Sequence, residues 1–131
     1  MDKNQTSIVD LLKTDKIVLP VIQSISEEEI KINKKKFTTN IIINNEGVKP
    51  WKLIEGKISI KDFNSLKSLD NIPELIIIGV GPILNNPYYE IRDYFSKHNL
   101  QFEIMTTKSA CRTWNILISE RNNICAYLIL K

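Results

Sequence analysis

Two glycines, Gly79 and Gly81, follow an apolar run and are the first residues whose spacing could serve a ligand. A Gly-x-Gly turn after a strand can approach the pyrophosphate of a dinucleotide, but the third glycine of that motif would stand where the chain has Leu84. We therefore interpret both glycines as residues that let the chain turn tightly at the carboxyl end of a central strand. Open α/β sheets bind ligands at that edge, so an anion or a small polar group could lie there.

Polar side chains also line a predicted helix over residues 107–120. Arg112, Asn115 and Ser119 are spaced three and four residues apart, which places them in a line beside the apolar face. Two interpretations are open: either Arg112 pairs with a carboxylate while Asn115 or Glu120 holds backbone, or a polar groove between this helix and the glycine turn binds an anionic group or a partner protein. The residues predicted to serve such binding are Gly79, Gly81, Glu103, Thr107, Arg112, Thr113, Asn115 and Glu120.

Histidine and cysteine residues are too few for most catalytic or metal sites. His98 is the only histidine, which nearly excludes a catalytic triad. Cys111 and Cys125 have neither the spacing of a metal site nor that of a secreted disulfide framework. Both stand among apolar neighbours, where free cysteine behaves as a small buried hydrophobe. We expect no metal, no cofactor and no catalytic residue.

The charge of this 131-residue chain is nearly balanced, with a formal net charge of +3. Of its 18 basic residues, 15 are lysine, whereas arginine makes the bidentate contacts favoured with phosphates and bases. Nucleic-acid binding is therefore not expected. The densest basic run, residues 31–36, contains four lysines, and we interpret it as a solvated hairpin tip.

The sequence carries no signal of secretion or membrane insertion. No apolar run approaches the roughly 18 residues of a membrane span. Residues 1–15, which we expect to form a flexible or loosely docked arm, have neither an apolar signal core nor an Arg-rich presequence. The two cysteines fit a reducing compartment. We therefore expect a soluble, cytoplasmic protein.

Strands and helices alternate along residues 74–130, which indicates a single α/β layered domain over residues 16–131. The N-terminal half adds β structure at an edge. There we expect a hairpin whose strands span residues 29–32 and 37–43 around a turn at Asn33 and Lys34.

Local signals also predict where helices begin. Ser59 and Asp62 match a capping box and predict a helix that begins near Ser59. A second helix is predicted with Asn86 as its cap and Pro87 at its first position.

The C-terminal part of the chain, residues 74–130, resembles a known family. Glu103 to Glu120 reads Glu-Ile-Met-Thr-Thr-Lys-Ser-Ala-Cys-Arg-Thr-Trp-Asn-Ile-Leu-Ile-Ser-Glu, with Ile-Ile-Ile-Gly-Val-Gly ending at Gly81 before it and Ala126-Tyr127-Leu128 after it. These motifs resemble a family of small α/β proteins of unknown function that includes mitochondrial complex I assembly factor 3. The family pattern is approximately Gly-Thr-Gly, Glu-x-Met-x-Thr and Ala-x-Arg-Thr-Tyr-Asn-x-Leu-x-x-Glu-Gly-Arg. The likeness covers residues 74–130, and the N-terminal half matches only in the order of elements.

The chain departs from that pattern at three points. Val80 replaces a small polar residue, Trp114 replaces the usual tyrosine, and Arg121-Asn122 stands where Gly-Arg is expected. The last change puts the role of the second arginine in doubt.

The resemblance implies a three-layer α/β domain with a mixed central sheet, and no established activity, cofactor or substrate. It favours a non-enzymatic binding or assembly protein, like a respiratory complex I assembly factor, with an unidentified protein partner. A homo-oligomer stays open. The alternative is a small-ligand (anion) binding protein or an enzyme that uses the groove between the Gly79–Gly81 turn and the 107–120 helix.

Overall fold

Two β-sheets and three helices make up the fold in the computed structural model, which describes residues 19–68, 72–121 and 123–130. The predicted N-terminal arm, residues 1–15, lies outside the described residues. The strands are β1 (Ile22–Ile25), β2 (Ile30–Ile32), β3 (Lys35–Phe37), β4 (Ile41–Asn44), β5 (Gly47–Pro50), β6 (Leu75–Gly79), β7 (Phe102–Met105) and β8 (Ile124–Leu128). The helices are the 3₁₀ helix η1 (Ile60–Ser68) and the α-helices α2 (Tyr89–Lys97) and α3 (Thr107–Leu117).

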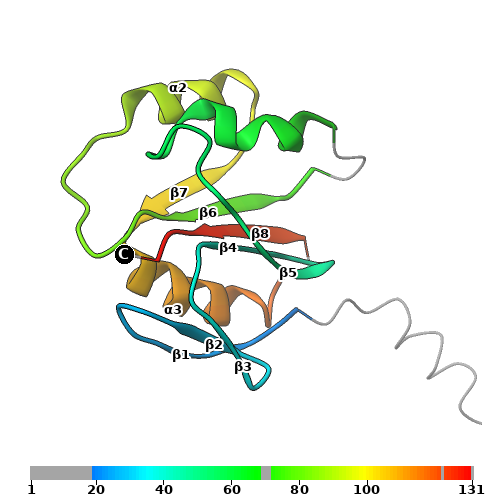
Figure 1. The fold of residues 1–131 in the computed structure, drawn as a ribbon. Coiled ribbons are helices and arrows are strands. Elements are labelled where there is room, and N and C mark those ends of the chain that lie inside the picture. Colours follow the sequence, from blue (N-terminus) through cyan, green and yellow to red (C-terminus); the bar gives the residue numbers. More distant parts are fainter. Residues whose placement is uncertain (1–18, 69–71, 122, 131) are drawn as a thin grey trace, which may run out of the picture.

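The central sheet is mixed and has the strand order β5-β4-β8-β6-β7. β6 is parallel to both β7 and β8, whereas β4 is antiparallel to β8 and to β5. Ile76, Ile77 and Ile78 are fully buried on β6, because η1 and α2 cover one face of the sheet and α3 covers the other (Figure 1). The predicted three-layer α/β domain with a mixed central sheet is therefore confirmed.

Strands β1, β2 and β3 form a second, antiparallel sheet against the outer side of α3 (Figure 1). Ile30 and Ile32 are buried there and share one apolar core with Trp114 of α3. A different hairpin, β4–β5, extends one edge of the central sheet. Helix α3 is thus enclosed between two sheets, which explains why Trp114 has no exposed surface.

The predicted strand over residues 37–43 is wrong. It is divided into β3 of the small sheet and β4 of the central sheet, separated by Thr38, Thr39 and Asn40. Asn40 holds the crossing, because its carbonyl accepts from the Trp51 amide (2.8 Å) and its side-chain oxygen accepts from the Leu130 amide (2.8 Å). The chain passes from the small sheet to the central sheet here, and the pattern of apolar residues does not indicate where it does so.

The predicted start of α2 is wrong, whereas the helix predicted to begin near Ser59 does begin there, at Ile60. Asn86 does not cap α2: its side-chain oxygen accepts from the Tyr88 amide (2.8 Å), and the helix begins only after Tyr88, which has a left-handed φ of 52°. The helix after Ser59 is 3₁₀. Half of its capping box forms, since the Asp62 carboxylate accepts from the Ser59 amide (2.9 Å).

Candidate functional site

Gly79 brings the end of β6 against the first turn of α3. A Cβ atom at this position would lie 2.8 Å from the Cα of Thr107 and 3.1 Å from the Cβ of Ala110. Real Cβ atoms do not approach backbone atoms so closely, so only glycine fits without a shift of the helix. Gly79 is therefore explained by the close packing of helix on strand and not, as expected, by a tight turn, since its φ is not positive.

Gly81 and Thr107 tie the glycine turn to α3. Gly81 has a φ of 102°, a left-handed value that favours glycine. Its amide donates to the Thr107 hydroxyl (2.8 Å), and its carbonyl accepts from the Thr107 amide (2.9 Å). The same hydroxyl donates to the Ile129 carbonyl (2.5 Å), just beyond β8. One buried side chain thus joins β6, β8 and α3.

Replacing Thr107 with valine is expected to lower the free energy of unfolding by about 2 to 4 kcal/mol, because the buried amide of Gly81 and carbonyl of Ile129 each lose a partner. Chemical denaturation monitored by circular dichroism measures the change. The control is Thr107→Ser, which keeps the hydroxyl and removes one methyl group, and should cost only about 1 kcal/mol. Equal losses in the two variants would contradict this role of the hydroxyl.

A cavity of about 610 Å³ opens beside this junction, at the carboxyl edge of the parallel strands. It is lined by Ile25, Ser26, Glu27, Gly81, Pro82, Thr107, Lys108, Ile129 and Leu130. Its volume falls in the range of small-molecule sites, about 300–1,000 Å³. Of the predicted site residues, the structure brings Gly81 and Thr107 to this cavity.

Sequence reasoning missed the other seven lining residues, which are residues 25–27, Pro82, Lys108, Ile129 and Leu130. Lys108 adjoins the predicted Thr107, and its position in the first turn of the helix could have identified it. Residues 25–27 are the end of β1 and the start of the β1–β2 connection, which reach the cavity only because the small sheet folds over α3. No motif near residues 25–27 predicts that they reach the cavity. Glu27 and Lys108, both exposed, give the cavity one acidic and one basic side chain.

Asn115 does not face the glycine turn, and that part of the predicted groove is wrong. Its side-chain nitrogen donates to the Ile22 carbonyl (2.8 Å), and its side-chain oxygen accepts from the Ile22 amide (2.9 Å). The neighbouring Trp114 donates from Nε1 to the Pro20 carbonyl (2.7 Å). Two successive residues of α3 therefore hold the backbone of β1 and the segment before it, as the structural interpretation of Asn115 proposed.

Replacing Asn115 with alanine is expected to lower the free energy of unfolding by about 2 kcal/mol, because the amide and the carbonyl of Ile22 both lose their side-chain partner. Urea denaturation measures the loss, and hydrogen exchange should locate it at β1. The matched control is Arg112→Ala on the same helix, which should change stability by less than about 0.5 kcal/mol because Arg112 is exposed. If Arg112→Ala lowered the free energy of unfolding more than Asn115→Ala, the structural role given to Asn115 would be contradicted.

The remaining predicted residues do not converge on the cavity. Arg112 is an exposed residue of α3, and no carboxylate of residues 19–68, 72–121 or 123–130 forms an ion pair with it. Glu103 is exposed on the edge strand β7. The Thr113 hydroxyl donates to the Met105 sulfur (3.4 Å). Glu120 is exposed and lies beyond α3, which ends at Leu117 and so is shorter than predicted.

Both cysteines are buried and free, Cys111 on α3 and Cys125 on β8. Burial raises the pKa of each thiol from 9.0 to about 12. Since the thiolate is the nucleophile, we expect neither residue to react with iodoacetamide in the folded protein at about pH 8, and both to react in urea, as measured by mass spectrometry. The raised pKa contributes stability that is fully present below pH 9.0 and lost as the pH rises toward about 12. Rapid labelling of the native protein would contradict this.

Within the described ranges, no group of three or more His, Cys, Asp or Glu residues is placed to hold a metal ion. A helix long and apolar enough to cross a membrane is likewise not found in that part of the chain.

Comparison with known proteins gives a family and two curated relatives. A family model described as a protein of unknown function (DUF498/DUF598) matches residues 22–129. The 13 kDa major membrane protein of Francisella tularensis subsp. holarctica (strain LVS) is 32% identical over 84 residues, covering 60% of this chain and 68% of that protein. The NADH dehydrogenase (ubiquinone) 1 alpha subcomplex assembly factor 3 of Xenopus tropicalis is 24% identical over 126 residues, covering 95% of this chain and 69% of that protein.

Solved structures share the fold. The crystal structure of an outer membrane protein from Bartonella henselae superposes with a TM-score of 0.72 at 21% identity, covering 85% of this chain and 94% of that chain.

Proposed function

Because this chain belongs to the DUF498/DUF598 family of proteins of unknown function, as its motifs predicted, we propose that it is a non-enzymatic binding protein that assists the assembly of a respiratory complex. The similarity to an NADH dehydrogenase assembly factor extends over 95% of the chain and supports this class of function. The observation that carries the proposal is an apolar loop between β6 and α2, which projects from the carboxyl edge of the central sheet (Figure 1).

This loop exposes three large apolar side chains within seven residues. Ile83 is 64% exposed, Leu84 43% and Tyr89, the first residue of α2, 76%. Single exposed apolar residues are common, but several gathered on one segment are typical of protein interaction sites. We call Pro82 to Tyr89 the apolar loop.

Hydrogen bonds hold the apolar loop at both ends. At its start, Gly81 exchanges two bonds with Thr107. At its end, Asn86 accepts from the Tyr88 amide (2.8 Å), and Arg92 Nε donates to the Pro87 carbonyl (2.7 Å). A segment that is already held loses less conformational entropy on binding, so its apolar side chains are well placed to contact a partner.

Hollows lie on both sides of this loop. The cavity of about 610 Å³ includes Pro82 at its rim. A second hollow of about 700 Å³ on the other side is lined in part by Asn86, Tyr88 and Tyr89. Side chains of a partner could enter either hollow while the partner covers Ile83 and Leu84, which is the arrangement of anchors and pockets found in protein interfaces.

The test is affinity capture from detergent-solubilised membranes of the source cell, comparing wild type with the double variant Ile83→Ser/Leu84→Ser. We expect subunits of the respiratory NADH dehydrogenase to be captured by wild type. The double variant should lose them about tenfold or more, the effect of losing about 1.4 kcal/mol of binding free energy.

The matched control is Ile72→Ser/Ile116→Ser, which removes two other exposed isoleucines, 52% and 64% accessible, that line neither hollow. It should capture as well as wild type. Capture of no NADH dehydrogenase subunit, or an equal loss in the control, would count against the proposal.

A second candidate is a small ligand in the 610 Å³ cavity, which the volume and Lys108 favour. Because Glu27 lines the same cavity, a zwitterion such as a free amino acid fits its charges better than a simple anion does. Thermal-shift screening of amino acids, organic acids and inorganic phosphate tests this, since a ligand at a hundredfold excess over its Kd stabilises by about 2.7 kcal/mol. A shift that survives in both Lys108→Gln and Glu27→Gln would place the ligand elsewhere.

A further inference from the structure

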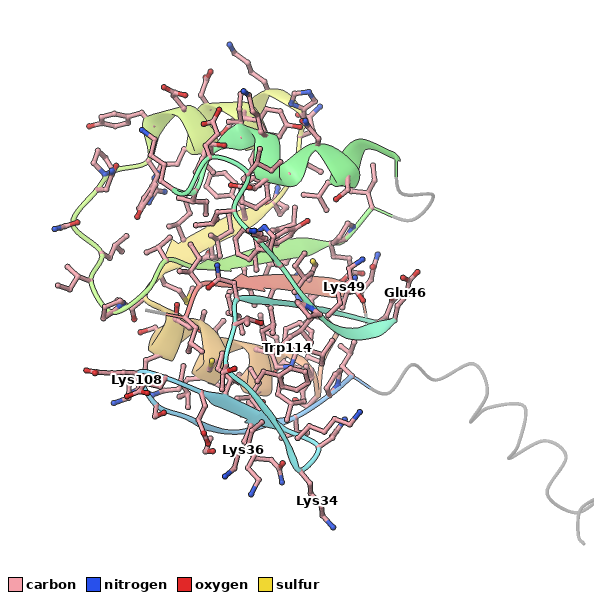
Figure 2. The ribbon with its side chains drawn as sticks, viewed as in Figure 1. Lys34, Lys36, Glu46, Lys49, Lys108 and Trp114 are labelled. Atoms are coloured by element: carbon pink, nitrogen blue, oxygen red, sulfur yellow. The ribbon has the colours of Figure 1, made fainter. Side chains whose placement is uncertain are left out.

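Four lysines, Lys31, Lys34, Lys35 and Lys36, lie on one hairpin of the small sheet. Lys35 pairs with the buried Ile32 and so lies on the side of the sheet that faces α3, and we call the other three, Lys31, Lys34 and Lys36, the lysine face. The hairpin turns at Asn33 and Lys34, whose φ values of 52° and 69° are both left-handed, as in the tight two-residue turn that joins hairpin strands. The Lys34 amide donates to the Gln23 side chain (2.6 Å), which ties this tip to β1. Lys34 and Lys36 point away from the rest of the molecule (Figure 2).

The register of β2 and β3 places like charges together. Lys31 is paired directly with Lys36, and Ser24 of β1 lies opposite Lys31 on the other side. Because Ile30 and Ile32 are buried toward α3, the alternation along the strand puts Lys31 and Lys36 on the outer side of the sheet. Like charges directly opposite each other across a strand pair are destabilising. The fold thus maintains an arrangement that costs it stability.

No acidic side chain forms an ion pair with these lysines in the part of the chain that the structure describes. Strands β1, β2 and β3 contain no Asp or Glu, and the three glutamates of this sheet, Glu27 to Glu29, lie in the β1–β2 connection at its opposite end. The ion pairs formed by the described residues join Lys61 to Glu55 and Lys97 to Asp93, on other elements. The sheet is therefore basic at one end and acidic at the other.

An apolar side chain stands beside the lysine face. Val21 is 50% exposed and precedes Ile22, which pairs with Ile32 next to the Asn33-Lys34 turn. The basic end of the sheet therefore presents lysines with one aliphatic side chain at the rim.

We propose that the lysine face, with Val21 beside it, binds the anionic surface of a phospholipid bilayer. Lysine interacts with phosphate as a point charge and needs no fixed geometry, which suits mobile headgroups. A nucleic-acid surface would favour arginine forks and stacked aromatic rings, and the lysine face has neither. The apolar loop lies on a different part of the molecule, so membrane attachment leaves it accessible and does not depend on the proposed function (Figure 1).

Co-sedimentation of the full chain with vesicles tests the proposal. We compare vesicles of phosphatidylcholine with about 30 mol % phosphatidylserine, which resemble an anionic leaflet, with vesicles of phosphatidylcholine alone. The wild type should bind only the anionic vesicles and should be released at about 0.5 M salt, where charges are screened within a few ångströms. The double variant Lys34→Gln/Lys36→Gln should lose binding about thirtyfold, since each lysine near such a surface contributes about fivefold.

The matched control is Lys57→Gln/Lys97→Gln, which removes the same charge from exposed lysines outside the small sheet and should bind within about twofold of wild type. The melting temperature of Lys34→Gln/Lys36→Gln should not fall, because the Lys31–Lys36 repulsion is removed, so a loss of binding cannot be a loss of fold. Equal binding to neutral vesicles, or an equal loss in the control, would overturn the proposal. Binding of a single-stranded DNA or polyglutamate probe by the same lysines without vesicle binding would also overturn it.

Discussion

Replacing Trp114 with alanine is expected to lower the free energy of unfolding by about 3 to 5 kcal/mol, the largest single effect we predict. The indole has no exposed surface and packs against both sheets, in one core with Ile30 and Ile32 of the small sheet and Ile41 and Ile43 of the central sheet. Figure 2 shows it beside α3, in the interior. Alanine would leave a cavity that neither sheet can fill.

Guanidinium chloride denaturation measures this loss, and Trp114→Phe separates packing from hydrogen bonding. Phenylalanine keeps most of the buried volume but cannot donate to the Pro20 carbonyl, as Nε1 does at 2.7 Å. We expect Trp114→Phe to cost about 1 to 2 kcal/mol, the value of one unmade hydrogen bond and a small volume change. If alanine cost no more than phenylalanine, the packing of α3 between the two sheets would be misjudged.

Replacing Gly79 with alanine is expected to lower the free energy of unfolding by about 2 to 3 kcal/mol, the cost typical of an overfilled core. The added Cβ would lie 2.8 Å from the Cα of Thr107, which is backbone and cannot rotate away, so α3 must shift. That shift would also disturb the hydrogen bonds between Thr107 and Gly81. Thermal and urea denaturation measure the effect.

Gly56→Ala is the control for this variant. Gly56 has a φ of 77° but no atom within 4 Å of an added Cβ, so alanine there introduces backbone strain without a clash and should cost only about 1 kcal/mol. Gly79 does not have a positive φ, so its substitution introduces the clash alone. If Gly79→Ala lowered the free energy of unfolding no more than Gly56→Ala, α3 would be able to shift at little cost, which would contradict the prediction.

Patterns within a few neighbouring residues correctly predicted several helices and strands. The fully apolar run after Leu75 indicated a strand covered on both faces, and β6 is that strand. Cys111 was expected to be buried among apolar neighbours, and it lies in the core beside Ala110 and Trp114. The prediction of one strand over residues 37–43 was wrong. The segment contributes to both sheets, and its apolar residues suit either of them.

The predicted site depended on contacts between distant residues, and here prediction from sequence was weaker. Gly81 and Thr107 could be expected near one another, because a parallel strand leads directly into α3. The partner of Asn115 could not, since it is the backbone of Ile22, 93 residues away. Because nearly every residue carries the same backbone amide and carbonyl, the amino-acid sequence does not indicate which backbone groups Asn115 will bind.

The amino-acid sequence by itself determined the family, the α/β class and the helix and strands of the last third, because these follow from motifs and from apolar periodicity over a few residues. The tertiary structure decided the rest. By folding the small sheet over α3 it directed Asn115 to β1, left Arg112 in solvent and completed the cavity with residues 25–27. The reason is physical: a side chain finds its partner through the packing of whole elements, and that packing depends on all of them at once.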